Sequence, residues 1–476
     1  MSTSGDTAVV REIADLPGPG GLPVVGNALQ LDAAHMHRTF EAWERRFGSI
    51  YRLRMGPHPF VVTSDSGLIA SILKERPGRF RRFSKMAQIF AETGLEAVFP
   101  AEGDAWRRQR QLWMQAMAAP KLRTFHQGLF TVTERLLRRW RNAASARTVI
   151  DLQADLMRYT VDVTMRFALG FDANTLESTG GVIQQHLDKI FPAIGRRISA
   201  PVPYWRWFKL PADRELDRAI EGALKEVHAL IAAARARIAA HPELRTSPSC
   251  LLEALIAAQD ADATQLSDQE LFGNALAALL AGEDTTANTL AWMVWFIAQH
   301  ADVQQHLQEE ADAATGGADL LSDPGALERV PFLDAVMNET LRLKPVAPIM
   351  MVEANEDVVL GGVRLPAGTG IVQLMRLGGL KDSEYPDPLA FKPERGWARQ
   401  PSDPGAVRPT MPFGFGPRIC PGRNLAVTEV RSVTTMLMRN FSVELVPGSA
   451  PVDERLAFTM MPTNLRIRLT ERSKSR

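Results

Sequence analysis

A run of 29 residues, Leu271 to Gln299, limits the fold more than any other feature of the sequence. It contains no proline, and apolar residues surround it on nearly every side. Ser267 and Glu270 form a capping box directly before the run, which predicts where a helix begins. Because a helix that is apolar all round must be buried inside a large protein, we expect a mainly helical fold built around this helix.

The centre of the run differs from its surroundings. Residues 281–286 place a glycine, two acids and two threonines in the expected core helix. A glycine inside a helix costs about 1 kcal/mol relative to alanine, and buried polar groups add a desolvation cost. Such local conflicts in the middle of a core helix indicate a functional site.

Composition excludes several classes of protein. The chain has 476 residues, 45% of them hydrophobic, and 55 Lys and Arg balance 54 Asp and Glu. These values are typical of a globular protein and argue against a disordered chain or a nucleic-acid-binding protein. Two cysteines, Cys250 and Cys420, support neither a disulfide framework nor a cysteine-rich zinc site. Residues 1–15 contain no signal sequence or membrane span, so we expect a cytoplasmic monomer without a membrane anchor.

The remaining patterns predict mostly helix with a minority of antiparallel strand. No long linker divides the chain, so we expect an N-terminal Pro/Gly-rich arm over residues 1–26 and a single domain over residues 27–476. Helix dominates residues 104–313. Strands are expected in a hairpin at residues 49–64, at residues 358–372, and in a final small sheet at residues 441–445 and 465–469.

A glycine-rich segment around the second cysteine carries the most specific signal. Residues 413–422 precede a helical run, and the glycines allow tight turns and close approach to a flat ligand. Pro421 suits the first turn of that helix. Cys420 would then lie at its positive end, near the cation Arg418, which favours a thiolate. A lone cysteine is more often an inert core residue, but this surrounding pattern argues against that alternative.

The spacing Phe413-Gly-x-Gly-x-Arg418-x-Cys420-x-Gly resembles the haem-binding loop of the cytochrome P450 superfamily. The resemblance implies the cytochrome P450 fold, with haem between the long central helix and the cysteine loop. It implies that Cys420 is the proximal thiolate ligand of the haem iron, and that Phe413 and Arg418 contact the cofactor. A thiolate ligand pushes electron density onto iron and favours cleavage of the O–O bond.

Two further motifs resemble the structural signature of that family. Glu339-x-x-Arg342 places both side chains on one helix face, although such pairs are common on surface helices. Phe391-x-Pro-x-Arg395 follows it in the order that the family shows. The resemblance implies that Arg395 joins Glu339 and Arg342 in a buried triad with a structural role.

The centre of the long helix resembles the oxygen-activation segment of the family. The resemblance implies that Ala281 and Gly282 adjoin the haem, with Gly282 giving room above it. Thr285 would hydrogen-bond dioxygen, and Asp284 would relay protons from water. For Thr285 alone, a hydroxyl bonded back to a helix carbonyl is the ordinary alternative.

Trp106-x-x-x-Arg110 resembles the element that holds a haem propionate, since both side chains can donate hydrogen bonds. Without the other motifs, a basic amphipathic helix would explain it. The sequence departs from the family at Val352, where many members have arginine, and at Leu380, where many have histidine. Propionate contacts are therefore expected only from Trp106, Arg110 and Arg418.

The implied activity is that of a haem-thiolate monooxygenase. The cofactor would be haem b, with NAD(P)H electrons delivered through a ferredoxin or flavodoxin type partner. The substrate would be a hydrophobic small molecule, such as a natural product, terpenoid, polyketide or fatty acid, that is hydroxylated or epoxidised. Core packing explains each expected pocket residue equally well; these are Met86, Ile89, Phe90, Leu95, Ala277, Val346, Met350 and Met461.

Several alternatives stay open from the sequence. A haem-thiolate peroxygenase, isomerase or dehydratase would keep the cofactor but not the dioxygen chemistry, and the Asp284-Thr285 pair argues against it. A non-catalytic haem-binding protein and a helical scaffold without haem are the others. A partner could dock on a basic face, although a solvated charged face explains the same arginines, namely Arg107, Arg108, Arg138, Arg139 and Arg141.

Overall fold

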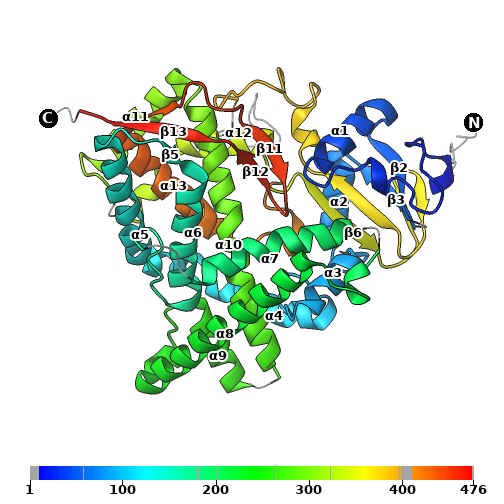
Figure 1. The fold of residues 1–476 in the computed structure, drawn as a ribbon, viewed down its shortest axis with the longest axis horizontal. Helices are drawn as coiled ribbons and strands as arrows, with labels where there is room; N and C mark the ends of the chain where they lie inside the picture. The colour runs from blue at the N-terminus through cyan, green and yellow to red at the C-terminus, as the bar shows by residue number, and fades with distance from the viewer. Residues whose placement is uncertain are drawn as a thin grey trace, which may run out of the picture.

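The computed structural model describes residues 10–56, 58–178, 182–200, 202–262, 264–321, 323–395, 397 and 410–473. Residues 1–9 of the expected arm and Pro57 of the expected hairpin turn lie outside the described residues. Helices form most of the molecule, and the larger sheet lies at one side of it, on the right in Figure 1. The prediction of a mainly helical fold with minor sheets is confirmed.

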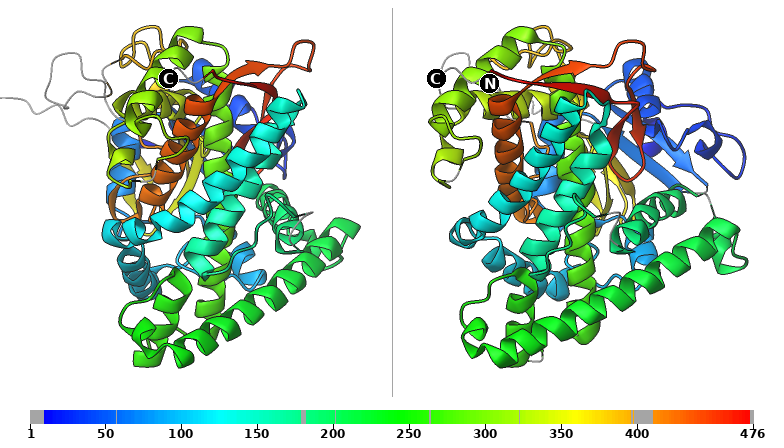
Figure 2. Two further views of the ribbon diagram at one scale, coloured as in Figure 1. Left: turned by 90° about the vertical axis from the view of Figure 1, so that its left-hand side faces the viewer. Right: turned by 60° about the vertical axis from the view of Figure 1, so that its left-hand side comes forward.

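The predicted core helix is α10, Asp268–Ile297, and it runs through the middle of the molecule (Figures 1 and 2). Its capping box forms as predicted, with the Glu270 N–H 3.0 Å from Ser267 Oγ and the Ser267 N–H 2.9 Å from Glu270 Oε2. Most of its side chains are buried. Helix α6, Leu152–Leu169, packs along it in the largest helix–helix contact of the described chain.

The other helices surround this pair. On the side of the larger sheet are α1 (Met36–Phe47), α2 (Ser66–Lys74) and α3 (Ser84–Glu92). The remainder are α4 (Gly103–Ala116), α5 (Ala119–Ser145), α7 (Val182–Ser199), α8 (Pro211–Ala240), α9 (Leu251–Ala261), α11 (Ala301–Thr315), α12 (Pro331–Leu343) and α13 (Arg423–Asn440).

The larger sheet has the strand order β2-β3-β9-β6-β4, with β2 Ile50–Met55, β3 His58–Thr63, β4 Phe80–Arg82, β6 Ile349–Ala354 and β9 Gly370–Leu374. The predicted hairpin is β2–β3. Most strand pairs are antiparallel, as predicted. β3 also pairs with β9 in parallel, and no pattern near either strand indicates this pairing.

Three smaller sheets complete the fold. The predicted final sheet pairs β10 (Phe441–Leu445) with β13 (Arg466–Glu471), and β5 (Ile150–Asp151) adds a short strand inside the region expected to be helical. β11 (Asp453–Leu456) and β12 (Met460–Thr463) form a hairpin. The third sheet is β1 (Arg11–Glu12), β8 (Val363–Leu365) and β7 (Val358–Leu360), with β1 parallel to β8.

The start of the described chain is part of this packing. β1 pairs with β8, and Leu16 is buried in a hydrophobic cluster with residues of β6 to β9. Residues 17–25 are otherwise exposed or partly exposed, and Gly26 and Asn27 are buried. The boundary of the arm at residue 26 stays a prediction. A parallel pairing between two short segments more than 350 residues apart leaves no local pattern in the sequence.

Candidate active site around Cys420

The cysteine loop is held in a fixed conformation by its glycines and by α2. Gly414 and Gly416 have φ angles of +74° and +71°, which side chains other than glycine rarely adopt. A Cβ on Gly416 would lie 2.5 Å from the carbonyl oxygen of Leu73, so the loop packs directly on the end of α2. The Cys420 N–H donates to the carbonyl of Phe413 at 2.9 Å, which closes the loop.

Cys420 is exposed, whereas Cys250 is buried. The protein around the Cys420 thiol nevertheless desolvates it, which raises its pKa above the ordinary value for cysteine. The N–H groups of Gly422 and Arg423 and the charge of Arg110 act in the opposite direction without outweighing burial. Residue 420 thus combines accessible surface with dense surroundings.

The expected lowering of this pKa is therefore not found in the protein alone. α13 begins at Arg423, so Cys420 lies in the turn before the helix rather than in its first turn. A metal ion at the sulfur would itself deprotonate the thiol, as metals do with coordinating cysteines. The role of Cys420 as a metal ligand stays a prediction.

The centre of α10 has an open face. Ala281 is exposed and Ala277 and Thr285 are partly exposed, although the helix around them is buried. These three residues follow a four-residue spacing and share one face. Accessible surface along one stripe of a core helix indicates a space beside that stripe, which a flat cofactor could fill.

Thr285 and Gly282 differ in part from expectation. The Thr285 hydroxyl donates to the carbonyl of Ala281 at 2.9 Å, which is the local bond that a helix threonine ordinarily makes. A Cβ on Gly282 would lie 2.3 Å from Thr164 Oγ1 on α6. The absence of a side chain at Gly282 therefore allows α10 to pack closely on α6. It does not provide the room that was expected above the cofactor. Asp284, the expected proton relay, is partly exposed beside Thr285.

The side chains expected to hold propionates lie together. The Arg418 guanidinium stacks on Trp106 of α4, with Cζ 4.6 Å from the ring centroid. Arg110, one turn further along α4, donates to the carbonyl of Ile419 at 2.6 Å. Arg418 also pairs with Glu102, a residue that the sequence analysis missed because it precedes α4 and carries no motif.

The expected triad is assembled, and its side chains are buried. Arg342 donates twice to Glu339, at 2.6 and 2.9 Å, and both side chains are 0% exposed. Arg395 Nε donates to Glu339 Oε1 at 2.9 Å. Trp397 joins the group by donating to Glu339 Oε2 at 3.1 Å, which the sequence motif did not indicate. The remaining N–H groups of Arg342 donate to the carbonyls of Gly379, Pro388 and Ala390.

A buried acid that the sequence analysis missed connects α13 to α10. Burial raises the pKa of Glu429 well above its usual range, and a hydrogen bond with the Thr286 side chain opposes that rise only in part. Burial therefore favours the neutral form of this carboxyl group. It links the helix after the cysteine loop to the residue next to Thr285.

The expected pocket residues divide into two groups. Ile89, Phe90, Leu95 and Val346 are buried, as core packing alone would predict. Met86, Ala277, Met350 and Met461 retain partial exposure. Met350 does not contact apolar neighbours alone, because its sulfur lies 3.8 Å from Arg76 Nη1. The pocket assignment stays a prediction.

The β11–β12 hairpin brings Met461 and Phe458 toward this region. The Phe458 ring lies 6.3 Å from Phe90 and 6.1 Å from Phe99. Asn288 of α10 donates to Thr459 at 3.0 Å, and the Met460 N–H donates to the carbonyl of Val346 at 2.8 Å. The hairpin tip is therefore fixed to α10 and to the segment before β6.

One carboxylate holds the base of this hairpin. Glu454 is buried. Its carboxylate lies 2.9 Å from His37 Nε2 and 3.1 Å from Arg38 Nε. It also lies 2.8 Å from Arg376 Nη1 and pairs with Lys344. Burial alone would raise the pKa of Glu454, but these partners together lower it far below the usual range. The group ties the hairpin to α1, to the end of α12 and to the segment after β9.

This network predicts acid sensitivity. Glu454 ionises in the unfolded chain near pH 4.3, and its lower pKa in the folded protein stabilises the fold above that pH. The stabilisation is lost as pH falls through the folded pKa. In urea titrations, Glu454→Gln should therefore be less stable than the wild type at pH 7, and the difference should shrink steadily below about pH 4. A difference independent of pH would contradict the ionised state assigned to Glu454.

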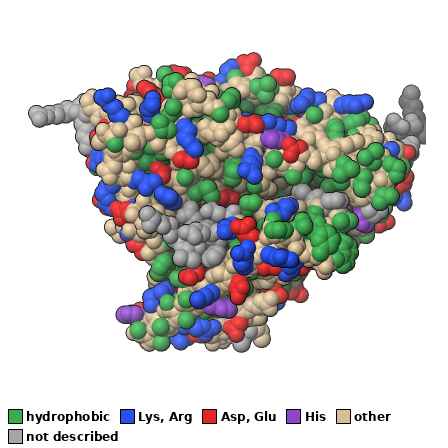
Figure 3. All heavy atoms as spheres, in the orientation of Figure 1, with side chains coloured by type: hydrophobic (Ala, Val, Ile, Leu, Met, Phe, Trp, Pro, Cys, Tyr) green, Lys and Arg blue, Asp and Glu red, His purple; other side chains and the backbone are tan. Residues whose placement is uncertain are grey.

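The arginines of the expected docking face are paired with acids. Arg138 contacts Glu134 and Glu177, Arg139 contacts Asp155, and Arg141 contacts Asp319 and Glu471. Arg107 and Arg108 pair with Asp104 and Glu270. Basic and acidic side chains also alternate over the surface in view in Figure 3. These contacts favour a solvated, charge-balanced face over a cationic docking surface.

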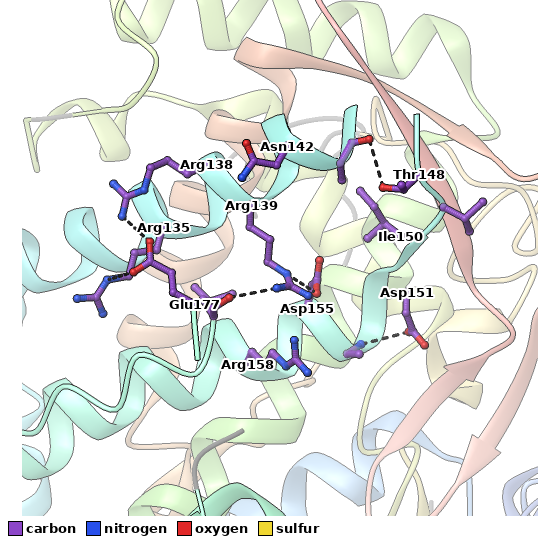
Figure 4. A pocket seen from close by; sticks show the side chains of 14 residues that line it. Arg135, Arg138, Arg139, Asn142, Thr148, Ile150, Asp151, Asp155, Arg158 and Glu177 are labelled. Carbon is purple, nitrogen blue, oxygen red and sulfur yellow. Dashed lines mark hydrogen bonds and ion pairs between the residues drawn. The ribbon is translucent and has the colours of Figure 1, made fainter. Parts of the chain in front are cut away.

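A hollow of about 820 Å³ lies between α5 and α6 at this face (Figure 4). Its walls include Arg139 and Arg158 together with Asp155 and Glu177, so both signs of charge line it. None of the expected catalytic, cofactor or substrate residues lines this hollow. It is separate from the candidate active site.

Comparisons with known proteins agree with this geometry. The family model described as Cytochrome P450 matches residues 16–469. The chain is 26% identical to the mitochondrial 25-hydroxyvitamin D-1 alpha hydroxylase of Mus musculus, over 97% of this chain and 93% of that protein. It is 27% identical to Protein LUTEIN DEFICIENT 5, chloroplastic, of Arabidopsis thaliana, over 90% of this chain and 73% of that protein.

Another relative is longer than this chain. The self-sufficient cytochrome P450 monooxygenase CYP505E5 of Aspergillus kawachii is 26% identical over 97% of this chain but only 44% of its own length. A crystal structure of a cytochrome P450, CYP102L1, superposes with a TM-score of 0.81 at 23% identity, covering 96% of this chain and 99% of that one. Among the helices of the described residues, none combines the length and apolar character needed to span a bilayer.

Proposed function

Because the chain belongs to the cytochrome P450 family of monooxygenases, we propose that it inserts one oxygen atom of dioxygen into a hydrophobic small molecule, by hydroxylation or epoxidation. The observation that carries this proposal is the loop around Cys420. It combines two glycines in left-handed conformations, an exposed cysteine residue, and the Trp106, Arg110 and Arg418 cluster beside it.

The residues present fit a haem. The exposed stripe of Ala277, Ala281 and Thr285 on α10 supplies one wall with accessible surface, and Cys420 supplies a second surface with a potential iron ligand. When bound, haem supplies the activation of dioxygen and the electron transfer that no side chain performs. Cys420 would hold the iron through its sulfur, with Phe413 and the loop glycines beside the ring.

The role of α10 is to deliver protons. The Thr285 hydroxyl already lies on the open face of the helix, and breaking one bond of 2.9 Å to Ala281 frees it to hydrogen-bond a ligand there. Asp284, the next residue toward the N-terminus, is partly exposed and would pass protons from water to Thr285.

The role of the triad is structural. Glu339, Arg342 and Arg395 join α12 to the segment that leads into the cysteine loop, through carbonyl groups of residues 379–390 as well as through one another. Since every donor of Arg342 has a partner, this segment is fixed where it turns toward the site. The triad would thereby set the position of the loop without touching substrate.

The substrate is proposed to be hydrophobic. The partly exposed residues near the site are mainly apolar and include three methionines, whose flexible side chains adapt to irregular shapes: Met86, Ala277, Met350 and Met461. The related proteins carry names as different as a vitamin D hydroxylase and a flavonoid 3'-monooxygenase. Natural product, terpenoid, polyketide and fatty acid are therefore the classes to screen.

Electrons are proposed to come from NAD(P)H through a separate ferredoxin or flavodoxin type protein. The family requires an electron donor, and self-sufficient relatives show that the donor can also be fused. The paired arginines of α4 and α5 do not single out a docking face.

A screen for spin-state changes tests this function. A substrate that displaces solvent from the haem should shift the Soret band from the low-spin to the high-spin position. The hits should then be converted with NAD(P)H and a surrogate redox system, with one oxygen atom from labelled dioxygen in the product. Turnover with peroxide alone, or isomerisation without NAD(P)H, would favour the alternative haem-thiolate activities.

Thr285→Ala should uncouple electron use from product formation. The variant loses the only hydroxyl of the exposed stripe, so NAD(P)H consumption should continue while peroxide replaces most of the product. Thr289→Ala is the matched control, because Thr289 makes the same back-bond to Thr285 at 2.8 Å and is nearly buried one turn further on. Equal coupling in both variants would contradict the role of Thr285.

A further inference from the structure

Arg76, in the turn between α2 and β4, is a buried arginine with too few partners. Its side chain is 4% exposed, and neither Nε nor Nη2 has a hydrogen-bond partner. Nη1 reaches only the sulfur of Met350, at 3.8 Å. An unsatisfied guanidinium inside a protein is costly, so a feature of this kind indicates a missing anionic ligand.

Two other arginines adjoin Arg76. Arg82 of β4 donates from Nε to the carbonyl of Phe99 at 2.8 Å, and Arg418 of the cysteine loop leaves its Nε without a partner. Burial lowers the pKa of Arg76 and of Arg82, and the charge of Arg76 lowers the pKa of Arg82 further. The three cations therefore repel one another in a poorly solvated place.

A single carboxylate, Glu102, acts on all three. It accepts the backbone N–H of Arg82 at 2.8 Å and pairs with Arg418, so its oxygens are already engaged. Three guanidinium groups and one carboxylate leave an excess of two positive charges. A ligand with two negative charges would balance this cluster.

The cluster is located where such a ligand would reach the active site. Arg76 lies three residues beyond Leu73, on whose carbonyl the cysteine loop packs. Arg82 lies opposite Val352 in the β4–β6 pairing, so a guanidinium flanks the position that lacks one. Arg418 connects the cluster to Trp106 through its stacking contact.

We propose that Arg76, supported by Arg82, binds the propionate carboxylates of the haem in this protein and completes the set formed by Trp106, Arg110 and Arg418. The inference rests on the proposed haem function. Val352 of β6 stands where many family members have arginine, and it offers no hydrogen-bond donor to a propionate. Arg76, in the turn after α2, would make that contact instead. Arg76 is a cofactor-binding residue here and takes no part in proton delivery.

The test compares release of haem with release of its dimethyl ester, in which both propionates are neutral. Haem transfer from the holoprotein to apomyoglobin should be roughly tenfold faster, or more, for Arg76→Met than for the wild type. With the dimethyl ester the two proteins should release the group at equal rates. Arg76→Lys, which keeps the charge, should recover part of the retention.

Arg79→Met is the matched control. Arg79 lies in the same turn but is exposed and pairs with Glu75 and Glu356, so its removal should leave haem transfer unchanged. A second measurement guards against a merely structural effect: removing the unpaired charge should leave the apoprotein as stable to urea as the wild type, or more stable.

Two results would overturn the inference. Haem transfer at the wild-type rate in Arg76→Met would show that Arg76 binds no propionate. Equal acceleration with haem and with its ester, or a less stable apoprotein, would show that Arg76 only supports the fold. If the wild type takes up no haem, the proposed function itself fails, which is a different outcome from either of these.

Discussion

Replacing Cys420 by serine is expected to abolish substrate turnover and the red-shifted Soret band of the reduced, carbon monoxide-bound protein. A serine oxygen is not ionised at neutral pH and cannot supply the electron density that a thiolate gives to iron. Haem should still be retained in part, because Trp106, Arg110 and Arg418 are untouched. Optical spectra and product analysis with a surrogate redox system measure both effects.

The control for this variant is Cys250→Ser. Cys250 is buried at the start of α9, far along the chain from the loop, and contacts Gly170 rather than the candidate site. Its removal should leave the spectrum and turnover intact. A red-shifted band that survives Cys420→Ser but not Cys250→Ser would move the ligand to the other cysteine.

Replacing Glu339 by glutamine should destabilise the protein by about 3–5 kcal/mol, the usual cost of removing one partner from a buried ion pair. Both Arg342 and Arg395 would lose their only shared carboxylate, and the neutral amide would turn a donor toward arginine donors. Urea unfolding of the purified protein measures the loss, and the haem content should fall with it. If this variant does not accumulate, Glu339→Asp tests the same contact with the charge retained.

Asp104→Asn is the matched control for Glu339→Gln. Asp104 forms an ion pair with Arg107 at the same spacing of three residues, but both side chains are well exposed. Such surface pairs contribute little to stability, so this variant should unfold like the wild type. Equal, small effects of the two substitutions would contradict a bracing role for the triad.

Much of the fold was predictable because its signals are local. The capping box at Ser267 and Glu270 and the proline-free apolar run after it predict α10 to within a few residues. The hairpin at residues 49–64 and the final sheet follow from alternation and turn residues. The cysteine loop and the triad were predictable for another reason, since fixed spacings of rare residue combinations resemble a known family.

What sequence reasoning missed depends on partners far apart in the chain. Glu454 meets His37 across 417 positions, and no pattern near either residue indicates the contact. Gly282 was read as space for a cofactor because its neighbour Thr164 belongs to another helix. A lowered pKa was expected for Cys420 because the sequence indicates the start of the helix after it. The sequence does not indicate the burial that raises this pKa.

The absorption spectrum of the reduced wild-type protein under carbon monoxide tests the central claim most directly. Ligation of haem iron by Cys420 predicts a strongly red-shifted Soret band that is lost in Cys420→Ser. An unshifted band, as given by a histidine ligand, or a purified protein that binds no haem would contradict the account.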